Sequence, residues 1–249
     1  MDKISIISSD ARYEALNEIL LKNGFDSCIS DVNTLNSPKA LILPIKSALA
    51  DEDFFKISQN LSKRTIVFSG ESDRLARFFD GKIINYARDE QFLDKNAYIT
   101  AECALGFAIM EMKKSVKDSK FAIIGYGRIG KHLCKILLSL GARVSVCARR
   151  DESRKTASEA GAVALDPEAM KSALEKSDFD VLYNTVPQKI IEKSISDSLS
   201  PKTRVYDLAS LPGGFEDTDF PKRLLALPGK IMPYASAMAI FDFVKPYIV

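Results

Sequence analysis

The sequence predicts an α/β protein of two domains, each an open, mostly parallel sheet with helices on both faces. Apolar, β-branched runs alternate with amphipathic stretches along the chain, which is the pattern of parallel strands joined by helices. The length of 249 residues is long for one compact core and suits two modest domains. In the second half, one strand-like run leads into a helix through a glycine-rich turn, Gly125-Tyr126-Gly127-Arg128-Ile129-Gly130.

The first domain is expected over residues 1–96 and has the alternation of a flavodoxin-like α/β domain. Strands are predicted at residues 3–8, 40–45, 64–69 and 82–86. Between them, apolar side chains recur at helical spacing over residues 10–22, before Gly24, and the pattern is repeated over residues 51–61. We assign the substrate side of the protein to this domain.

A long helix is predicted over residues 97–117, inside a connector assigned to residues 97–118. The second domain is expected over residues 119–232 and is of the Rossmann type. Its strands are predicted at residues 121–125, 143–148, 180–185 and 204–208, and its helices at residues 130–140, 153–160, 170–175 and 190–199. A last helix over residues 236–248, in a segment covering residues 233–249, is expected to return to the first domain.

Charge and hydropathy exclude several classes of protein. The 35 basic and 33 acidic residues leave a net charge of +2, which is too small a field to hold a polyanion, so nucleic acid is not an expected partner. The N-terminus enters a strand-like run without the pattern of a signal peptide, and no apolar stretch approaches about 18 residues. We therefore expect a cytoplasmic protein with no membrane partner.

The glycine-rich turn predicts a dinucleotide-binding site. It directly follows the apolar strand at residues 121–124 and opens a helix, the context in which such glycines bind a pyrophosphate. Gly125 is expected to make the tight turn, Gly127 to let the backbone approach the ligand, and Gly130 to bring helix and strand together. The helix N-terminus then offers free N–H groups and a positive dipole to the anion.

The end of the second strand favours NADP over NAD. A carboxylate at this point binds the ribose 2′-hydroxyl of NAD, and this strand instead ends in Ala148-Arg149-Arg150. Arg149 or Arg150 can pair with a 2′-phosphate through a charge-assisted fork. The alternative is that Arg149 and Arg150 belong to a solvated basic turn that binds no phosphate. NAD therefore stays possible as the cofactor.

Two further segments are expected to form the rim of this site, because ligands bind at the carboxyl ends of strands in open α/β sheets. The first follows the strand at residues 180–183, and the second leaves the next strand before a glycine pair. The predicted cofactor-binding residues in them are Asn184, Thr185, Val186 and Pro187, and Asp207, Leu208 and Ala209. An ordinary loop is the alternative interpretation for each.

The cysteines and the single histidine predict no metal site and restrict the chemistry. Cys28, Cys103, Cys134 and Cys147 are scattered without a CxxC pair, and we interpret them as buried core residues. His132 is interpreted as a helix-surface residue, so the chain lacks the histidine acid/base of the 2-hydroxyacid dehydrogenases and any Ser-His-Asp or Cys-His apparatus. Oxidation of a dihydropyridine fits this restriction, because aromatisation supplies driving force.

Several short motifs give the whole chain a family resemblance. They are Ser9-Asp10-Ala11-Arg12, Ile42-Leu43-Pro44, Phe68-Ser69-Gly70, Asp207-Leu208-Ala209-Ser210 with Pro212-Gly213-Gly214, and Leu227-Pro228-Gly229. With them, the chain resembles the A subunits of dipicolinate synthase, which spore-forming bacteria use to make pyridine-2,6-dicarboxylate. The resemblance implies an NADP-linked conversion of a dihydrodipicolinate-type dicarboxylate to dipicolinate, together with a second, flavoprotein-like subunit.

The resemblance also implies site residues. Arg12, Ser69 and Ser236 are candidate substrate binders, and Thr100 and Glu102 are candidate catalytic residues, with Glu102 handling the proton. The connector helix departs from the family pattern at Ile99 and Cys103, where a proline and a glycine are expected. Tyr234 and Ala235 stand where the family has a lysine and a threonine, a loss that Ser236 or Lys230 can offset.

Two other functions stay open at this point. One is a non-catalytic NADP-binding partner or regulator, which the lack of histidine and of the Lys-Thr pair favours. The other is a small-acid dehydrogenase of the shikimate-dehydrogenase type, for which a Lys and Asp pair is expected and is not evident in this sequence. A homo-oligomer also stays open.

Overall fold

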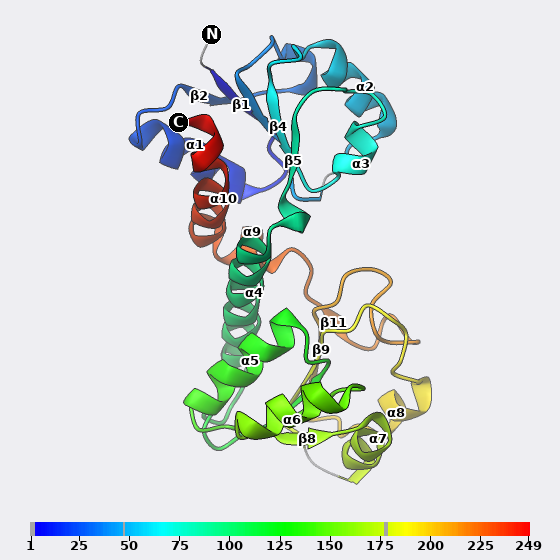
Figure 1. The fold of residues 1–249 in the computed structure, drawn as a ribbon. Coiled ribbons are helices and arrows are strands. Elements are labelled where there is room, and N and C mark those ends of the chain that lie inside the picture. The colour runs from blue at the N-terminus through cyan, green and yellow to red at the C-terminus, as the bar shows by residue number, and fades with distance from the viewer. Residues whose placement is uncertain (1–2, 47, 177–178) are drawn as a thin grey trace. The chain divides into compact units, whose positions relative to one another are not determined.

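The computed structural model describes residues 3–46, 48–176 and 179–249, and it folds them into two units that each contain a parallel sheet (Figure 1). Unit 1 consists of Met1–Ile99 and Pro228–Val249, and unit 2 of Thr100–Leu227. The chain thus leaves unit 1 once, builds unit 2, and returns to unit 1 for its last segment.

The sheet of unit 1 has the strand order β2-β1-β3-β4-β5, with every neighbouring pair parallel. This strand order is the one found in flavodoxin-like folds. The strands are β1 Ile4–Ile6, β2 Ser27–Ile29, β3 Ala40–Ile42, β4 Ile66–Ser69 and β5 Ile83–Asn85. The helices are α1 Ala11–Lys22, α2 Asp51–Gln59, α3 Ser72–Leu75, α9 Leu227–Ile231 and α10 Pro233–Ile248. The first residue of α9, Leu227, still belongs to unit 2. Two short 3-10 helices, η1 Val32–Thr34 and η2 Tyr86–Arg88, complete the unit.

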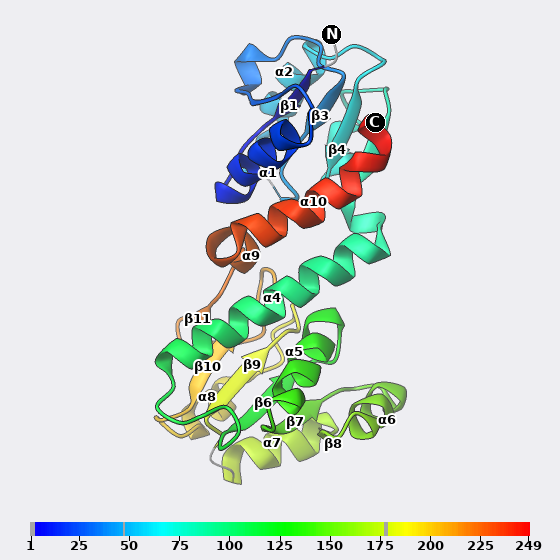
Figure 2. The ribbon, with the colours of Figure 1, turned by 90° about the vertical axis from the view of Figure 1, so that its left-hand side faces the viewer.

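Helices cover both faces of the unit 1 sheet. One face packs against α2 and α3 through a buried cluster that contains Leu41, Val67 and Phe54. On the other face α1 lies along α10, an arrangement that both views of the ribbon show (Figures 1 and 2). There Phe243 of α10 meets the ring of Phe68 edge to face, with 6.2 Å between the centroids.

The sheet of unit 2 has the order β11-β10-β9-β6-β7-β8, again with all pairs parallel. The order reverses between β6 and β9, as in the Rossmann fold, so the carboxyl ends of β6 and β9 mark the switch point where ligands bind. The strands are β6 Lys120–Ile124, β7 Arg143–Cys147, β8 Val163–Leu165, β9 Val181–Asn184, β10 Arg204–Asp207 and β11 Lys222–Arg223. The helices are α4 Glu90–Glu111, which begins in unit 1, α5 Arg128–Ser139, α6 Asp151–Glu159, α7 Pro167–Lys176 and α8 Lys193–Ser198.

Alternating side chains give the unit 2 sheet two apolar faces. Ala122 and Leu182 point to the face covered by α7 and α8, in a cluster with Met170. On the opposite face the rings of Tyr183 and Tyr206 stack at 5.5 Å, and the Tyr183 hydroxyl donates to the backbone oxygen of Ala104 on α4 at 3.0 Å. The strands are therefore buried on both faces, as in α/β folds generally.

The predicted connector helix is displaced toward the N-terminus. We expect it over residues 97–117, whereas α4 covers Glu90–Glu111. The side chain of Asp89 accepts the backbone N–H of Phe92 at 2.6 Å, which is the bond of a helix N-cap. An N-cap three residues before an apolar position is therefore the start signal that the sequence interpretation missed.

The other differences concern short elements. The sequence analysis did not predict β2, β8 or β11, which are edge strands of two or three residues. The helix expected at residues 190–199 is reduced to α8, because the N–H groups of Ile190 and Ile191 bind the oxygen of Gly214 and hold these residues extended. The last helix begins at Pro233 instead of residue 236, with proline in the first turn.

Candidate cofactor-binding site

The turn between β6 and α5 has the close packing that its glycines predict. Gly125 has a φ of +97°, and a Cβ atom there would lie 2.4 Å from Oγ1 of Thr185. A Cβ atom at Gly130 would lie 2.2 Å from the backbone oxygen of Gly125. Side chains at either position are excluded by the chain itself, so these two glycines fix how the strand, the turn and the helix meet.

Gly127 is different, because neither its backbone conformation nor its surroundings among the described residues require a glycine there. Its φ is −80°, which any residue adopts, and a Cβ atom at this position meets no atom within 4 Å. Gly127 is also the N-cap of α5, a helix of 12 residues whose first N–H groups point out of the turn. The open space lies where a pyrophosphate approaches the backbone in dinucleotide-binding turns.

A cavity of about 470 Å³ lies at this edge of the unit 2 sheet. The predicted cofactor-binding residues that line it are Gly125, Tyr126, Gly127, Arg149, Arg150, Thr185, Val186 and Pro187. Other lining residues that the sequence interpretation missed are Cys147, Ser153, Pro167, Met170, Lys171 and Leu174. The cavity walls are mainly apolar, with a few polar groups, as is usual for a cofactor site.

Arg128, Ile129 and Gly130 do not line the cavity. They form the first turn of α5, where Gly130 is buried against the preceding turn. Their contribution to the site is the position of the helix N-terminus.

Arg149 and Arg150 project from the turn after β7, and both are exposed. Within the part of the chain that the structure describes, neither guanidinium makes an ion pair. Arg154 fixes the turn behind them, because its Nη1 donates to the backbone oxygens of Ala148 and Arg149 at 2.7 Å each. The end of β7 thus offers two positive charges on a rigid turn and no carboxylate that would repel a phosphate.

Asn184 and Asp207 lie at the carboxyl ends of the neighbouring strands β9 and β10, and both are buried. The Nδ2 atom of Asn184 donates to Oδ1 of Asp207 at 2.8 Å and to the backbone oxygen of Val186 at 3.0 Å. Asp207 also accepts the backbone N–H groups of Ala209 and Gly214, each at 3.1 Å. These two side chains therefore hold the rim loops in place and do not face the cavity, while Leu208 and Ala209 are buried beside them.

Thr100 and Glu102 lie on α4, and the structure does not bring their side chains together. Residues two apart on a helix are separated by about 200° around its axis, so they point to nearly opposite sides. Thr100 is buried and Glu102 is half-buried. One substrate atom cannot contact both groups from the same side of the helix, and we keep Glu102 as the candidate for proton transfer.

The three candidate substrate binders all lie in unit 1 and are buried. Nε of Arg12 donates to Oδ1 of Asp10 at 2.8 Å, so its charge is already paired. The Oγ atom of Ser69 accepts the N–H of Glu71 at 3.0 Å, and Ser236 lies in the first turn of α10. The polar groups of Arg12 and Ser69 therefore bond within unit 1.

The thiols near the cavity are in their neutral form at physiological pH. Burial raises the pKa of Cys147, which lines the cavity, to about 11, and it raises the pKa of Cys134 on α5 to about 11 as well. A thiol that stays protonated is a poor nucleophile and a poor metal ligand. Both behave as small core residues.

Comparison with known proteins gives one family match and several relatives. Residues 106–194 match the model of the family described as D-isomer specific 2-hydroxyacid dehydrogenase, NAD binding domain. The A subunit of dipicolinate synthase from Bacillus subtilis (strain 168) is 28% identical, over 93% of this chain and 90% of that protein. The crystal structure of the corresponding A subunit from Bacillus halodurans superimposes with a TM-score of 0.81 at 21% identity, covering 99% of this chain and 97% of that one. The crystal structure of the Bacillus subtilis A subunit gives a TM-score of 0.78 at 22% identity, covering 98% and 94%.

These matches confirm the predicted fold class and the resemblance. The match to an NAD-binding domain confirms a nucleotide-binding Rossmann domain with NAD(P) as its cofactor, and it supports the expected class, an NAD(P)-dependent oxidoreductase. No helix among the described residues is long and apolar enough to cross a membrane. Over nearly its whole length, the chain is similar to the A subunit of dipicolinate synthase, as its motifs predict.

Proposed function

We propose that the chain is an NADP-dependent oxidoreductase component that converts a dihydrodipicolinate-type dicarboxylate to dipicolinate, and that it works with a second, flavoprotein-like subunit. The observation that carries the cofactor assignment is the open space over Gly127 together with the exposed Arg149 and Arg150 in the turn after β7, which line the same cavity. The substrate and the partner rest on the similarity to the A subunit of dipicolinate synthase.

The chemistry requires little from the protein. The substrate loses one hydride and one proton, and its ring becomes aromatic, so the reaction has its own driving force. The bound dinucleotide supplies the hydride acceptor. Glu102, a half-buried carboxylate on α4, is the proposed proton acceptor, and Asn184 and Asp207 keep the rim loops in the geometry that orients the cofactor.

Cofactor preference is tested by fluorescence titration with NADPH and NADH. The wild type should prefer NADPH about tenfold or more, which corresponds to about 1.4 kcal/mol of phosphate recognition. Arg149→Ala or Arg150→Ala should remove that preference. Arg143→Ala is the matched control, since Arg143 is exposed at the start of β7, the opposite end of the same strand. Equal affinity of the wild type for both cofactors contradicts the NADP assignment.

Substrate and partner are tested by the ultraviolet absorbance of dipicolinate formed from freshly generated dihydrodipicolinate with NADP. Turnover by this chain, enhanced by a flavoprotein-like subunit, is expected, and Glu102→Gln should lower kcat without changing NADPH affinity. Tight NADPH binding without turnover, with or without the second subunit, supports the other candidate, a non-catalytic NADP-binding subunit. Tyr234 and Ala235, at the start of α10 where the resemblance implies lysine and threonine, favour that second candidate.

A further inference from the structure

Arg223 lies at the same edge of the unit 2 sheet as the glycine turn, in a position that no prediction above includes. It ends β11, which runs parallel to β10, and its register partner on β10 is Asp207. All six strands of this sheet are parallel, so the carboxyl ends of β6, β10 and β11 share one edge. Arg223 therefore stands at the ligand-binding edge of the sheet.

The guanidinium of Arg223 has two N–H-bearing atoms without a partner. Nη1 donates to the backbone oxygen of Pro212 at 3.3 Å. Among the buried side-chain nitrogen and oxygen atoms of the described residues, Nε and Nη2 of Arg223 are the ones that lack a hydrogen bond. Nε and Nη2 lie on the same side of the guanidinium, and this edge donates two parallel hydrogen bonds to a carboxylate.

The neighbouring Asp207 does not use this edge. Its two oxygens accept from Asn184, Ala209 and Gly214, and the described residues contain no ion pair between Asp207 and Arg223. Gly213 lies between the two side chains, since a Cβ atom there would be 2.5 Å from Oδ2 of Asp207 and 2.8 Å from Nη2 of Arg223. The glycine backbone thus packs beside the guanidinium, and a side chain at this position would collide with it.

Buried N–H groups without an acceptor destabilise the folded chain, because Nε and Nη2 of Arg223 have lost water and gained no hydrogen bond. An anionic group of a ligand that accepts hydrogen bonds from Nε and Nη2 would remove this destabilisation. The pyrophosphate at the glycine turn is too far away to do so, because β6 and β11 are three strand spacings apart, about 14 Å. The loop over the guanidinium has an exposed tip, with Leu211 72% exposed, and a ligand reaches the two buried nitrogens only when this tip moves aside.

We propose that Arg223 is a substrate-binding residue that holds one carboxylate of the dicarboxylate through Nε and Nη2. The inference rests on the proposed function for the identity of the substrate. It assigns the carboxylate site to a pair of atoms whose hydrogen-bonding capacity is otherwise unused.

The first test measures binding of pyridine-2,6-dicarboxylate by calorimetry to the full chain saturated with NADPH. Arg223→Lys keeps the positive charge and loses the two parallel N–H donors, and it should weaken dicarboxylate binding about tenfold. Arg223→Met should weaken it about a hundredfold, while NADPH affinity stays at the wild-type value. Arg143→Met, which removes an exposed arginine from the opposite edge of the same sheet, should bind like the wild type. Equal dicarboxylate affinity in the wild type and both Arg223 variants overturns the inference and leaves the proposed function standing.

The second test uses thermal unfolding without ligand and does not depend on the substrate. Because the guanidinium edge is unpaired, Arg223→Met should unfold at the wild-type temperature or above it. A melting temperature lower by about 5 °C or more makes Arg223 a structural residue and overturns the inference.

A wild type that binds NADPH and does not bind pyridine-2,6-dicarboxylate contradicts the proposed substrate. Oxalate, malonate and benzoate are then titrated into the wild type and Arg223→Met. Binding of one of them to the wild type alone supports the carboxylate site for another acid. Binding of none overturns the inference as well.

Discussion

The Tyr206 hydroxyl on β10 donates to Oε2 of Glu111 at 2.7 Å, which ties the last turn of α4 to the unit 2 sheet. The other carboxylate oxygen accepts from Lys222 on β11 at 2.6 Å, and the Lys222 ammonium lies 4.3 Å from the ring centre of Phe107. One carboxylate therefore joins a helix to two neighbouring strands. Hydrogen bonds from Lys222 and then from Tyr206 lower the pKa of Glu111, while burial and the bond to Glu111 raise the pKa of Tyr206.

This carboxylate should make the stability of unit 2 sensitive to acid. Because the folded pKa of Glu111 lies below its unfolded value of 4.5, its contribution is complete above pH 4.5 and is lost as the pH falls through the folded pKa. The difference in unfolding free energy between the wild type and Glu111→Gln should be constant from pH 7 to about 5 and shrink below that. We expect at most about 1 kcal/mol, since the side chain is 37% exposed.

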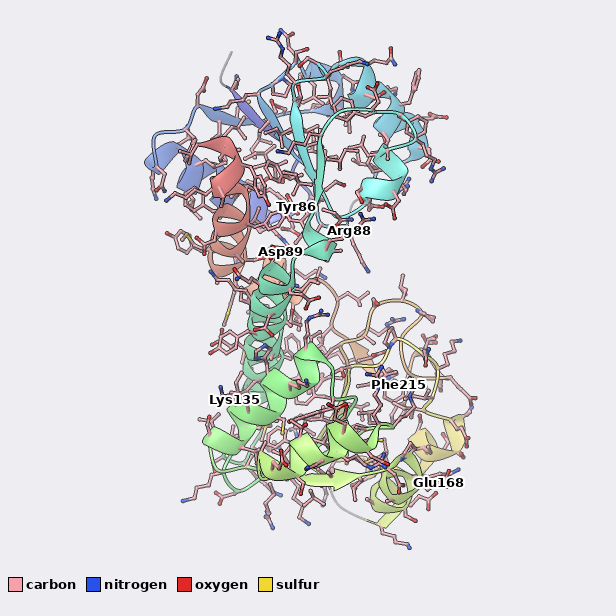
Figure 3. All side chains as sticks on the ribbon, in the orientation of Figure 1. Tyr86, Arg88, Asp89, Lys135, Glu168 and Phe215 are labelled. Carbon is pink, nitrogen blue, oxygen red and sulfur yellow. The ribbon has the colours of Figure 1, made fainter. Side chains whose placement is uncertain are left out.

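Urea denaturation at several pH values measures this difference. Glu168→Gln is the matched control, because Glu168 is an exposed residue of α7 that projects from the helix (Figure 3). A Glu111→Gln difference that does not shrink in acid, or one that Glu168→Gln reproduces, contradicts the assignment.

Two alanine substitutions in the glycine turn should separate ligand binding from folding. Gly127→Ala should leave the melting temperature unchanged or raise it, because the new methyl group meets open space at an ordinary φ, and it should weaken NADPH binding at least tenfold. Gly130→Ala should destabilise unit 2 by about 1–3 kcal/mol, because its methyl group meets the backbone of Gly125. If Gly127→Ala binds NADPH like the wild type, the pyrophosphate is not placed over this turn.

Removal of the Asn184 side chain should weaken both the fold and the cofactor site. Asn184→Ala leaves the buried Asp207 carboxylate with one donor fewer and releases Val186 of the rim loop. The expected loss is about 2–3 kcal/mol of unfolding free energy, accompanied by weaker NADPH binding. Ser139→Ala, which removes an exposed hydrogen bond in the same unit, should change stability by less than about 0.5 kcal/mol. Urea denaturation and NADPH titration of the same samples decide between these expectations.

The thiols should react with iodoacetamide in a defined order. Since burial raises the pKa of Cys134 and Cys147 to about 11, both should be alkylated slowly at pH 8, whereas the partly exposed Cys28 should react first. Peptide mass spectrometry after timed quenching gives the order, and all four cysteines should react together in 8 M urea. Early modification of Cys147 would show a thiolate in the cofactor cavity and contradict its neutral state.

The parts of this structure that are local in sequence could be predicted. A strand, a tight turn and a helix N-terminus are encoded by neighbouring residues, which is why the glycine turn could be located from the sequence. The structure places Gly125 and Gly127 on one cavity with Arg149 and Arg150, and their role in cofactor binding stays a prediction. The alternation of strands and helices likewise predicted two parallel sheets. The catalytic and substrate-binding assignments stay predictions.

The parts that depend on distant contacts could not be predicted. Asn184 and Asp207 fit a rim sequence, and only the pairing of β9 with β10 shows that their polar groups satisfy each other. Arg223 escaped notice because a two-residue strand has no periodicity and because its surroundings depend on Gly213, ten residues earlier. Phe215, labelled in Figure 3, belongs to the core of unit 2 through a bridge with Ile191 that no local pattern indicates.

The outermost strands of the unit 2 sheet, β8 with three residues and β11 with two, have a consequence for assembly. A strand this short exposes too few backbone donors and acceptors to template an added strand from another polypeptide. Unit 2 is thus protected against edge-to-edge aggregation. Any subunit that joins it has to be recognised by side chains on helices and loops, whose specificity can change through single substitutions without altering the sheet.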